Sequence, residues 1–407
     1  MIEADEMTDQ VIYDIQLAER QLRRRLETLR QQAYALPEGD TASPVNRQLL
    51  EAEQELQRLE EEHERLEKDP NQGVLMQAEP QQGPRFMGAK TTGTKVTVLL
   101  RQSHIPAGSV HLMDPEKTPL VSFDICYLGE EYTRVRVTSF VEAYSAKSIT
   151  TVELDAEKPT PEKPINHLPT FFPERLRPLT EMTRATLHIL IDDLDKTVEQ
   201  ENTFPIWLLP RTSAYLWTKD PTTNARIDLT HYLAAWVTPN APKVMQLLRR
   251  SADLHPDGQI VGYQVGPQGI ETQVKAIFEA LKEQGIHYIN STLCFGAGRG
   301  EMMQRIRLPS ESLDNRSANC IDGTVLMASV LEAATLNPGI VLVPGHAFLA
   351  WERAEDSGNW DYLETTMIGS RSFEEAHKAG QLQVAHRTPN LLSLPELRTK
   401  YGVTPME

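Results

Sequence analysis

Hydrophobic side chains recur at helical spacing through residues 7–68, in a background of Glu, Gln and Arg. In the second half of this region they follow steps of three and four, the a/d repeat of a coiled coil, at Leu49, Ala52, Leu56, Leu59, His63 and Leu66. The first half has a similar seam at Ile15, Ala18, Leu22 and Leu29. Pro, Gly and turn residues at 36–44 separate the halves. We therefore predict an antiparallel coiled-coil helical hairpin over residues 1–70.

The predicted hairpin has two interpretations. It is a solvated structural arm, or its apolar seams bind a partner protein or a second copy of the chain. Exposed seams on two helices rarely remain unpaired, so partner binding or self-association is expected as readily as a structural arm. The segment 71–89 that follows is rich in Pro, Gln and Gly, which predicts a linker.

Between residues 90 and 218 the pattern changes to short runs in which apolar and polar residues alternate. Clusters of Pro, Gly and Asp separate these runs, which are KVTVLLRQ, LVSFDICY, TRVRVTSFVEAY, SITTVEL and ATLHILIDDL. Their spacing predicts a β-sandwich of about seven strands. The His, Asp and Glu residues here are scattered singly among the turns, so we interpret the region as a scaffold or binding module.

Residues 219–407 mix helical and strand patterns, which predicts an α+β domain. Helices are expected at 228–237, 242–254 and 270–285, the last of which ends at a C′ glycine. Further on, IVLV and HAFLAWE are expected to form adjacent strands across a Pro-Gly turn, and WDYLETT is expected to form another. The whole chain is therefore predicted to be multidomain α+β.

A long apolar stretch begins at Cys320. Asn319 is a good N-cap, and Asp322 three residues later can reach back as in a capping box. The helix is therefore predicted to begin at Cys320. Only two charged residues, Asp322 and Glu332, occur between positions 321 and 336, so this helix is expected to be buried.

A cysteine at the first position of a helix meets free backbone N–H groups and the positive end of the helix dipole, and both favour the thiolate. His346, at the start of a strand packed on that helix, is the candidate general base. Asp361 or Glu364, on the next strand, is the candidate group that orients its ring. The alternative is structural, because a buried Cys is commonly a small hydrophobe and a lone His a satisfied core residue.

The order of these residues resembles the transglutaminase-like superfamily, which has a papain-like fold, and most of all bacterial transglutaminase-like modules of helicase and conflict-associated proteins. The resemblance covers residues 300–375, and its segments are RLPSESL from Arg307, Cys320 with Asp322, the apolar helix to Leu336, and VPGHAFLAW from Val343.

The resemblance implies that Cys320 is the nucleophile and that His346 is the general base and then the acid. It also implies that Glu364, four residues after Trp360, is the orienting acid. The superfamily usually has Asp at that place, so Asp361 remains open as a substitute.

The donors that would stabilise an oxyanion are less defined. The backbone N–H of Cys320 is the main candidate, and Gln304 or Asn319 could add a side-chain donor. Gln304 is equally well explained as an exposed loop amide, and capping already explains Asn319 and Asp322. Asp322 is therefore left out of the catalytic set.

The three cysteines, Cys126, Cys294 and Cys320, lie far apart without a CxxC pair, which argues against a disulfide framework and a four-ligand zinc site. Cys126 and Cys294 have no His nearby in sequence and are expected to be structural. GAGRG at 296–300 lacks the GK[ST] ending of a phosphate loop and is expected to be a flexible loop bordering the site. Neither a cofactor nor a metal is expected.

The formal net charge of the 407-residue chain is −16, and Lys and Arg do not cluster with aromatic residues. Direct nucleic-acid binding is therefore not expected. The acidic N-terminal segment lacks the apolar core of a signal peptide, and no segment reaches the ~18 consecutive apolar residues of a membrane span. We expect a cytoplasmic protein in a reducing compartment.

These observations favour a cysteine peptidase that cleaves a protein substrate with Cys320, His346 and Glu364. Hydrolysis, transamidation and deamidation share one acyl-enzyme, and the sequence does not separate them. An alternative from another class is an interaction adaptor in which the hairpin and the sandwich bind partners. A third interpretation combines the two as a protease held inactive until a partner binds the hairpin, and the resemblance implies a role in bacterial defence.

Overall fold

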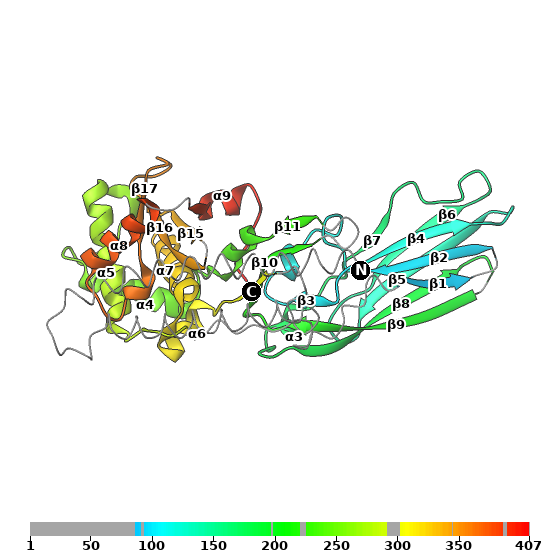
Figure 1. Cartoon of the computed structure of the whole chain (residues 1–407), viewed down its shortest axis with the longest axis horizontal. Helices are drawn as coiled ribbons and strands as arrows, with labels where there is room; N and C mark the ends of the chain where they lie inside the picture. The colour runs from blue at the N-terminus through cyan, green and yellow to red at the C-terminus, as the bar shows by residue number, and fades with distance from the viewer. Residues whose placement is uncertain are drawn as a thin grey trace, which may run out of the picture. The chain divides into compact units, whose positions relative to one another are not determined.

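The computed structural model describes residues 86–90, 93–196, 198–219, 225–290, 302–343, 345–385 and 389–406. The chain divides into two units, Met1–Gln81 and Gln82–Glu407, and all described residues belong to the second. The hairpin predicted over residues 1–70 and most of the predicted linker lie outside the described residues. The second unit is a mixed α+β fold with several sheets (Figure 1).

The N-terminal part of this unit contains two sheets. The first has the order β1-β2-β4-β7, formed by Phe86–Lys90, Thr94–Leu100, Val121–Tyr127 and Ile165–His167. The second has the order β3-β9-β8-β5-β6, formed by His104–Pro106, Val198–Leu209, Thr183–Asp193, Thr133–Val141 and Ser148–Leu154. Two short helices lie in the connections, η2 (Val110–Leu112) and α3 (Pro173–Leu176). Neighbouring strands are antiparallel except β3 and β9, which are parallel.

One hydrophobic cluster joins the two sheets. In β2 of the first sheet Val96 and Val98 are fully buried, and in β5 of the second sheet Val135 and Val137 are fully buried. These residues are two apart because successive side chains of a strand point to opposite faces. The alternation seen in the sequence is therefore the alternation between this core and the outer surface.

The two sheets contain nine described strands, so the prediction of about seven was too low. β1 begins at Phe86, inside the predicted linker, and β3 and β7 have only three residues each. β9 has a polar first half and contains Pro205, which obscured its pattern. The proline is tolerated because β3 pairs only with Trp207–Leu209, so β9 has a single neighbour at Pro205.

Two smaller sheets follow. The first has the order β11-β10-β13, formed by Arg226–Asp228, Ser213–Lys219 and Met302–Arg305. The second is the parallel pair β12 (His287–Tyr288) and β14 (Ser317–Ala318). β10 was expected to belong to the sandwich region, but it pairs instead with strands that follow residue 225.

The C-terminal part combines one antiparallel sheet with helices. The sheet has the order β17-β16-β15-β18, formed by Trp360–Leu363, His346–Glu352, Pro338–Val343 and Asn390–Ser393. The α-helices are α4 (Pro242–Leu254), α5 (Pro267–Glu283), α6 (Pro309–Asn315), α7 (Cys320–Ala333), α8 (Phe373–Ala385) and α9 (Leu394–Thr399). The 3-10 helices are η3 (Thr230–Trp236), η4 (Gly262–Gln264) and η5 (Thr365–Met367).

The helices predicted for this part are partly confirmed. α4 has the predicted bounds, and α5 begins three residues before the predicted start and is followed by Gly285 at a positive φ of 71°. The helix predicted at 228–237 is wrong in type, because Thr230–Trp236 is a 3-10 helix. The predicted pairing of IVLV with HAFLAWE is confirmed by β15 and β16.

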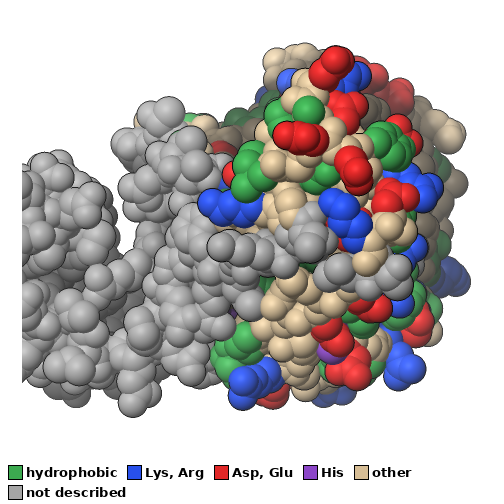
Figure 2. Space-filling model, turned by 90° about the vertical axis from the view of Figure 1, so that its right-hand side faces the viewer, with side chains coloured by type: hydrophobic (Ala, Val, Ile, Leu, Met, Phe, Trp, Pro, Cys, Tyr) green, Lys and Arg blue, Asp and Glu red, His purple; other side chains and the backbone are tan. Residues whose placement is uncertain are grey.

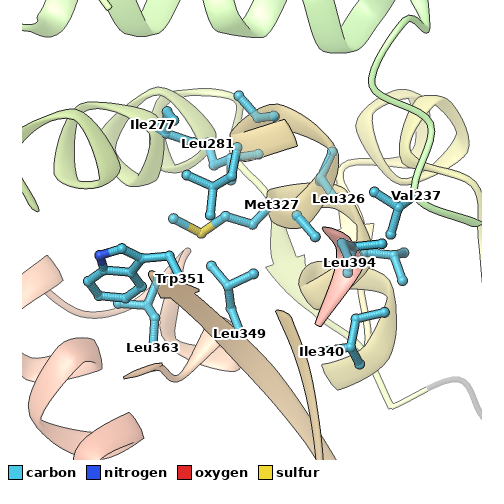
Figure 3. Close-up of a cluster of buried hydrophobic side chains, with 14 of the residues drawn as sticks. Val237, Ile277, Leu281, Leu326, Met327, Ile340, Leu349, Trp351, Leu363 and Leu394 are labelled. Carbon is cyan, nitrogen blue, oxygen red and sulfur yellow. The ribbon is translucent and has the colours of Figure 1, made fainter. Parts of the chain in front are cut away.

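α7 is the central helix of the C-terminal core. Its side chains from Ile321 to Leu331 are all buried, as the apolar stretch predicted. In Figure 3, Met327 of α7 lies between Leu281 of α5 and Leu349 of β16. The helix ends at Ala333, three residues before the predicted end, and Thr335 then adopts a positive φ of 58°.

The surface of the two-sheet part carries paired charges. Arg134 of β5 lies 2.8 Å from Asp195, and Arg136 lies 2.7 Å from Asp192. On the face shown in Figure 2, acidic and basic side chains are interspersed, without a continuous patch of Lys and Arg among the described residues. Within the described ranges, no helix combines the length and apolar character needed to cross a membrane.

Candidate functional site

The first turn of α7 is built by the capping box that the sequence predicted. The side chain of Asn319 accepts a hydrogen bond from the N–H of Asp322 at 2.8 Å, and Asp322 Oδ2 accepts one from the N–H of Asn319 at 3.1 Å. These bonds satisfy donors that have no partner inside the helix. Cys320 is therefore the first helical residue, as predicted.

Asp322 has a further partner that the sequence did not reveal. Its Oδ1 accepts from the backbone N–H of Arg307 at 2.7 Å, and its Oδ2 lies 3.1 Å from the guanidinium of the same residue. Burial raises the pKa of Asp322, and the hydrogen bonds and charge of Arg307 oppose that rise. Arg307 thus supplies positive charge beside the carboxylate of Asp322, two residues after Cys320.

Short polar contacts attach η5 to this turn. The carbonyl oxygen of Cys320 accepts hydrogen bonds from the hydroxyls of Thr324 at 2.7 Å and Thr365 at 3.3 Å. Gly323 allows this approach, because a Cβ there would lie only 3.3 Å from the side chain of Thr365. The residues around Thr365 are therefore held against the first turn of α7.

His346 and Glu364 meet at the ends of neighbouring strands. His346 is the first residue of β16, and Glu364 follows the last residue of β17. The ring Nε2 lies 2.7 Å from Glu364 Oε2, and the two side chains are 20% and 7% exposed. Since an ionised carboxylate can only accept, Nε2 carries the proton in this bond. The remaining nitrogen, Nδ1, is left for the thiol.

The charged partners of His346 determine its protonation. Burial alone would lower the pKa of this imidazole, but hydrogen bonds to Cys320 and Glu364, and the charges of both groups, raise it to about 9. Burial likewise favours the neutral form of Glu364, but the hydrogen bond and charge of His346 bring its pKa below the usual value. The imidazolium–carboxylate pair is thus the stable form near neutral pH.

Asp361, the other candidate for the third group, faces elsewhere. Its Oδ1 lies 2.8 Å from His377 Nε2, and its Oδ2 accepts from Arg353 at 2.9 Å. Asp361 and Leu363 are both buried on one face of β17, and Trp360 and Tyr362 alternate onto the other face. Of the two carboxylates, Glu364 contacts His346, whereas Asp361 contacts His377 and Arg353.

The other predicted donors and thiols are separate from this arrangement. Gln304 lies in β13 and donates its side-chain amide to the carbonyl of Arg305 at 3.0 Å. Cys126 and Cys320 are both free and partly buried, and Cys126 lies in β4. Cys294 and residues 296–300 lie outside the described residues.

The two-sheet part contains a serine–histidine contact that the sequence did not predict. His167 Nδ1 lies 2.9 Å from Ser139 Oγ, and its Nε2 lies 2.9 Å from Thr150 Oγ1. Ser139 is fully buried and His167 is 4% exposed, so a substrate has no access to them. Burial lowers the pKa of His167 to about 4, and we interpret it as a neutral link between the two sheets.

No group of three or more His, Cys, Asp and Glu side chains is arranged to hold a metal ion within the part of the chain that the structure describes. The sequence matches no model of a known protein family, and no curated protein matches it. The interpretation of the site therefore depends on its geometry.

Proposed function

We propose that the protein is a cysteine peptidase in which Cys320, His346 and Glu364 form the catalytic triad. The observation that carries this proposal is the 2.7 Å contact between Glu364 and His346, whose ring is also hydrogen-bonded to a thiol at the first position of a helix. Helix N-termini favour thiolates, and a carboxylate-bound imidazole is a suitable proton acceptor. The same geometry supports assigning residues 219–407 to a transglutaminase-like, papain-like domain.

The proposed reaction uses the thiol of Cys320, the ring of His346 and the backbone N–H of Cys320. In the imidazolium form of His346 the ring already holds the thiol proton on Nδ1, and Cys320 Sγ forms a bond to the substrate carbonyl carbon while the carbonyl electrons move to its oxygen. The backbone N–H of Cys320 has no partner inside the helix and is placed to stabilise that oxygen. The C–N bond then breaks, and the imidazolium gives its proton to the leaving amine.

The second half regenerates the enzyme. His346 removes a proton from water, the oxygen attacks the thioester carbon, and the C–S bond breaks to release an acid and the thiol. If an amine replaces water, the product is a new amide, and if the substrate is a glutamine side chain, hydrolysis is a deamidation. Glu364 stabilises the imidazolium in each case.

The remainder of the chain has a supporting role in this proposal. We assign the two sheets joined by one core to a β-sandwich that acts as a scaffold or binding module, and residues 1–70 to a coiled-coil hairpin that binds a partner or a second copy. A cytoplasmic location fits the two free thiols among the described residues. A role in bacterial defence enters the proposal only through the resemblance of residues 300–375.

The test combines thiol labelling with product analysis. Full-length protein is incubated with a proteome-derived peptide library, with and without a primary amine, and products are identified by mass spectrometry. New peptide termini that require Cys320 support hydrolysis, whereas amine incorporation or glutamine deamidation redirects the proposal to transfer or side-chain hydrolysis. Absence of all three, together with an unreactive Cys320, would favour the adaptor interpretation.

A further inference from the structure

We propose that Thr366 is the positioning residue that holds the Glu364 carboxylate against His346, a role that rests on the proposed function. The two oxygens of Glu364 have different partners. Oε1 accepts hydrogen bonds from Thr366, at 3.1 Å from its backbone N–H and 2.7 Å from its hydroxyl. Oε2 is thereby turned toward His346 Nε2, at 2.7 Å.

The backbone at Glu364 is fixed independently of Thr366. The N–H of Glu364 donates to the carbonyl of Ala376 at 3.1 Å, which ties it to α8. Gly380 of α8 packs so closely that a Cβ there would lie 2.6 Å from the backbone N of Leu363. The part of Glu364 that remains free to rotate is its side chain, which has one torsion more than an aspartate.

Thr366, in the first turn of η5, restricts the rotation of the Glu364 side chain. Glu364 is the N-cap of η5, so its side chain folds back over the first turn instead of extending from β17. Thr365, between the two, donates its hydroxyl to the carbonyl of Cys320. The orienting acid and the nucleophile are therefore attached to the same short helix, and Thr366 fixes which carboxylate oxygen reaches the imidazole.

The chain contains a matched local structure without a catalytic partner. Asp228 Oδ1 accepts from the backbone N–H of Thr230 at 2.9 Å and from its hydroxyl at 2.7 Å, again at the start of a 3-10 helix. Asp228 is exposed, whereas Glu364 is buried. Thr230→Val is therefore a control that also removes a threonine hydroxyl bonded to a carboxylate. Thr230 is distant from Cys320 in sequence, and the hydroxyl that is lost bonds to Asp228 and not to Glu364.

The experiment compares Thr366→Val, Thr366→Ser and Thr230→Val in the full-length protein. The imidazole of His346 is titrated by NMR, and iodoacetamide alkylation of Cys320 is measured across pH. In Thr366→Val we expect the His346 titration to move to lower pH and turnover to fall about ten- to a hundred-fold, as for the loss of a hydrogen bond to a charged group. Thr366→Ser should restore both values, and Thr230→Val should change neither.

A double-mutant cycle makes the test decisive. If Thr366 acts through Glu364, Thr366→Val has no further effect on the His346 titration in a Glu364→Ala background. An unchanged titration in Thr366→Val, with a loss of thermal stability like that of Thr230→Val, would show an ordinary helix cap and overturn the proposal. The titration needs no substrate, so a protein without turnover can still confirm or reject the role of Thr366, whereas an unreactive wild-type Cys320 counts against the proposed function alone.

Discussion

A buried histidine and a partly buried histidine in this protein have opposite acid–base behaviour. His167, in the two-sheet part, has its pKa lowered to about 4, whereas His346, beside α7, has its pKa raised to about 9. Burial lowers the pKa in both cases. The difference comes from the partners, which are the hydroxyls of Ser139 and Thr150 for His167, and a thiol and a carboxylate for His346.

A histidine hydrogen-bonded to a serine or cysteine is therefore not sufficient to define a catalytic site. A hydroxyl can donate or accept, so it bonds equally well to a neutral ring, and it does not compensate for the lost hydration of an imidazolium. A carboxylate selects the charged form. The partly exposed Cys320 also differs from the fully buried Ser139, so accessibility and charge distinguish the two regions together.

The largest expected effect comes from removing the thiol at the charged histidine. Cys320→Ala should lower turnover by about four or more orders of magnitude, as for the loss of the nucleophile of a triad, with the fold retained. Iodoacetamide should modify Cys320 faster than Cys126 in the wild type, although both thiols are free and partly buried. The rates are measured by mass spectrometry of digested protein. Equal rates, or hydrolysis retained by Cys320→Ala, would contradict the assignment.

The next effect tests the carboxylate that distinguishes the two histidines. Glu364→Ala should lower turnover by about two or more orders of magnitude, because the ring loses its orientation and the imidazolium its counter-charge. The pKa of His346 should then fall toward that of His167, as measured by NMR titration. Glu364→Gln keeps an acceptor and most of the volume, so it separates charge from shape. A His346 titration that stays near pH 9 in both variants would show that Glu364 is not the main cause.

The sequence predicted the parts of the site that depend on local chemistry. The helix start at Cys320 follows from Asn319 and Asp322, which are close in sequence and bond to the same turn. The choice of Glu364 over Asp361 came from the resemblance of residues 300–375, which implies an acid four residues after Trp360. The capping box uses residues within three positions of each other, where backbone geometry limits the possibilities.

The remainder depends on contacts between segments distant in sequence. Arg307 reaches Asp322 only because the chain before α6 returns to the start of α7, and His377 reaches Asp361 only because α8 covers β17. The missed strand β9 has the same origin, since its proline is acceptable only where the neighbouring strand ends. Propensity and periodicity contain no information about such neighbours.

A smaller effect on turnover is expected at the second carboxylate of β17. Asp361→Asn should change turnover by less than about tenfold, because its side-chain partners are Arg353, His377 and Gln381 and not His346. It should lower the free energy of unfolding by about 1–3 kcal/mol, since a buried charged hydrogen-bond acceptor is lost. Turnover and denaturant unfolding are measured on the same preparation. A larger loss of turnover for Asp361→Asn than for Glu364→Gln would assign the orienting role to Asp361.

The smallest effect on the thiol chemistry is expected at His167, where the consequence is a pH dependence of stability. The unfolded His167 binds a proton near its ordinary pKa of 6.5, whereas the folded residue resists protonation until about pH 4. The unfolded state therefore binds more protons between these values, and the free energy of unfolding falls as the pH falls, by up to about 3 kcal/mol.

The contribution of His346 to the free energy of unfolding depends on pH in the opposite direction. Its folded pKa of about 9 lies above 6.5, so its contribution is lost as the pH rises from 6.5 through 9. His167→Gln can still donate to one hydroxyl and accept from the other, so denaturant unfolding at several pH values should lose the slope between pH 6.5 and 4 and keep the alkaline slope. If this variant kept the acid slope, or slowed alkylation of Cys320, the contrast between the two histidines would be wrong.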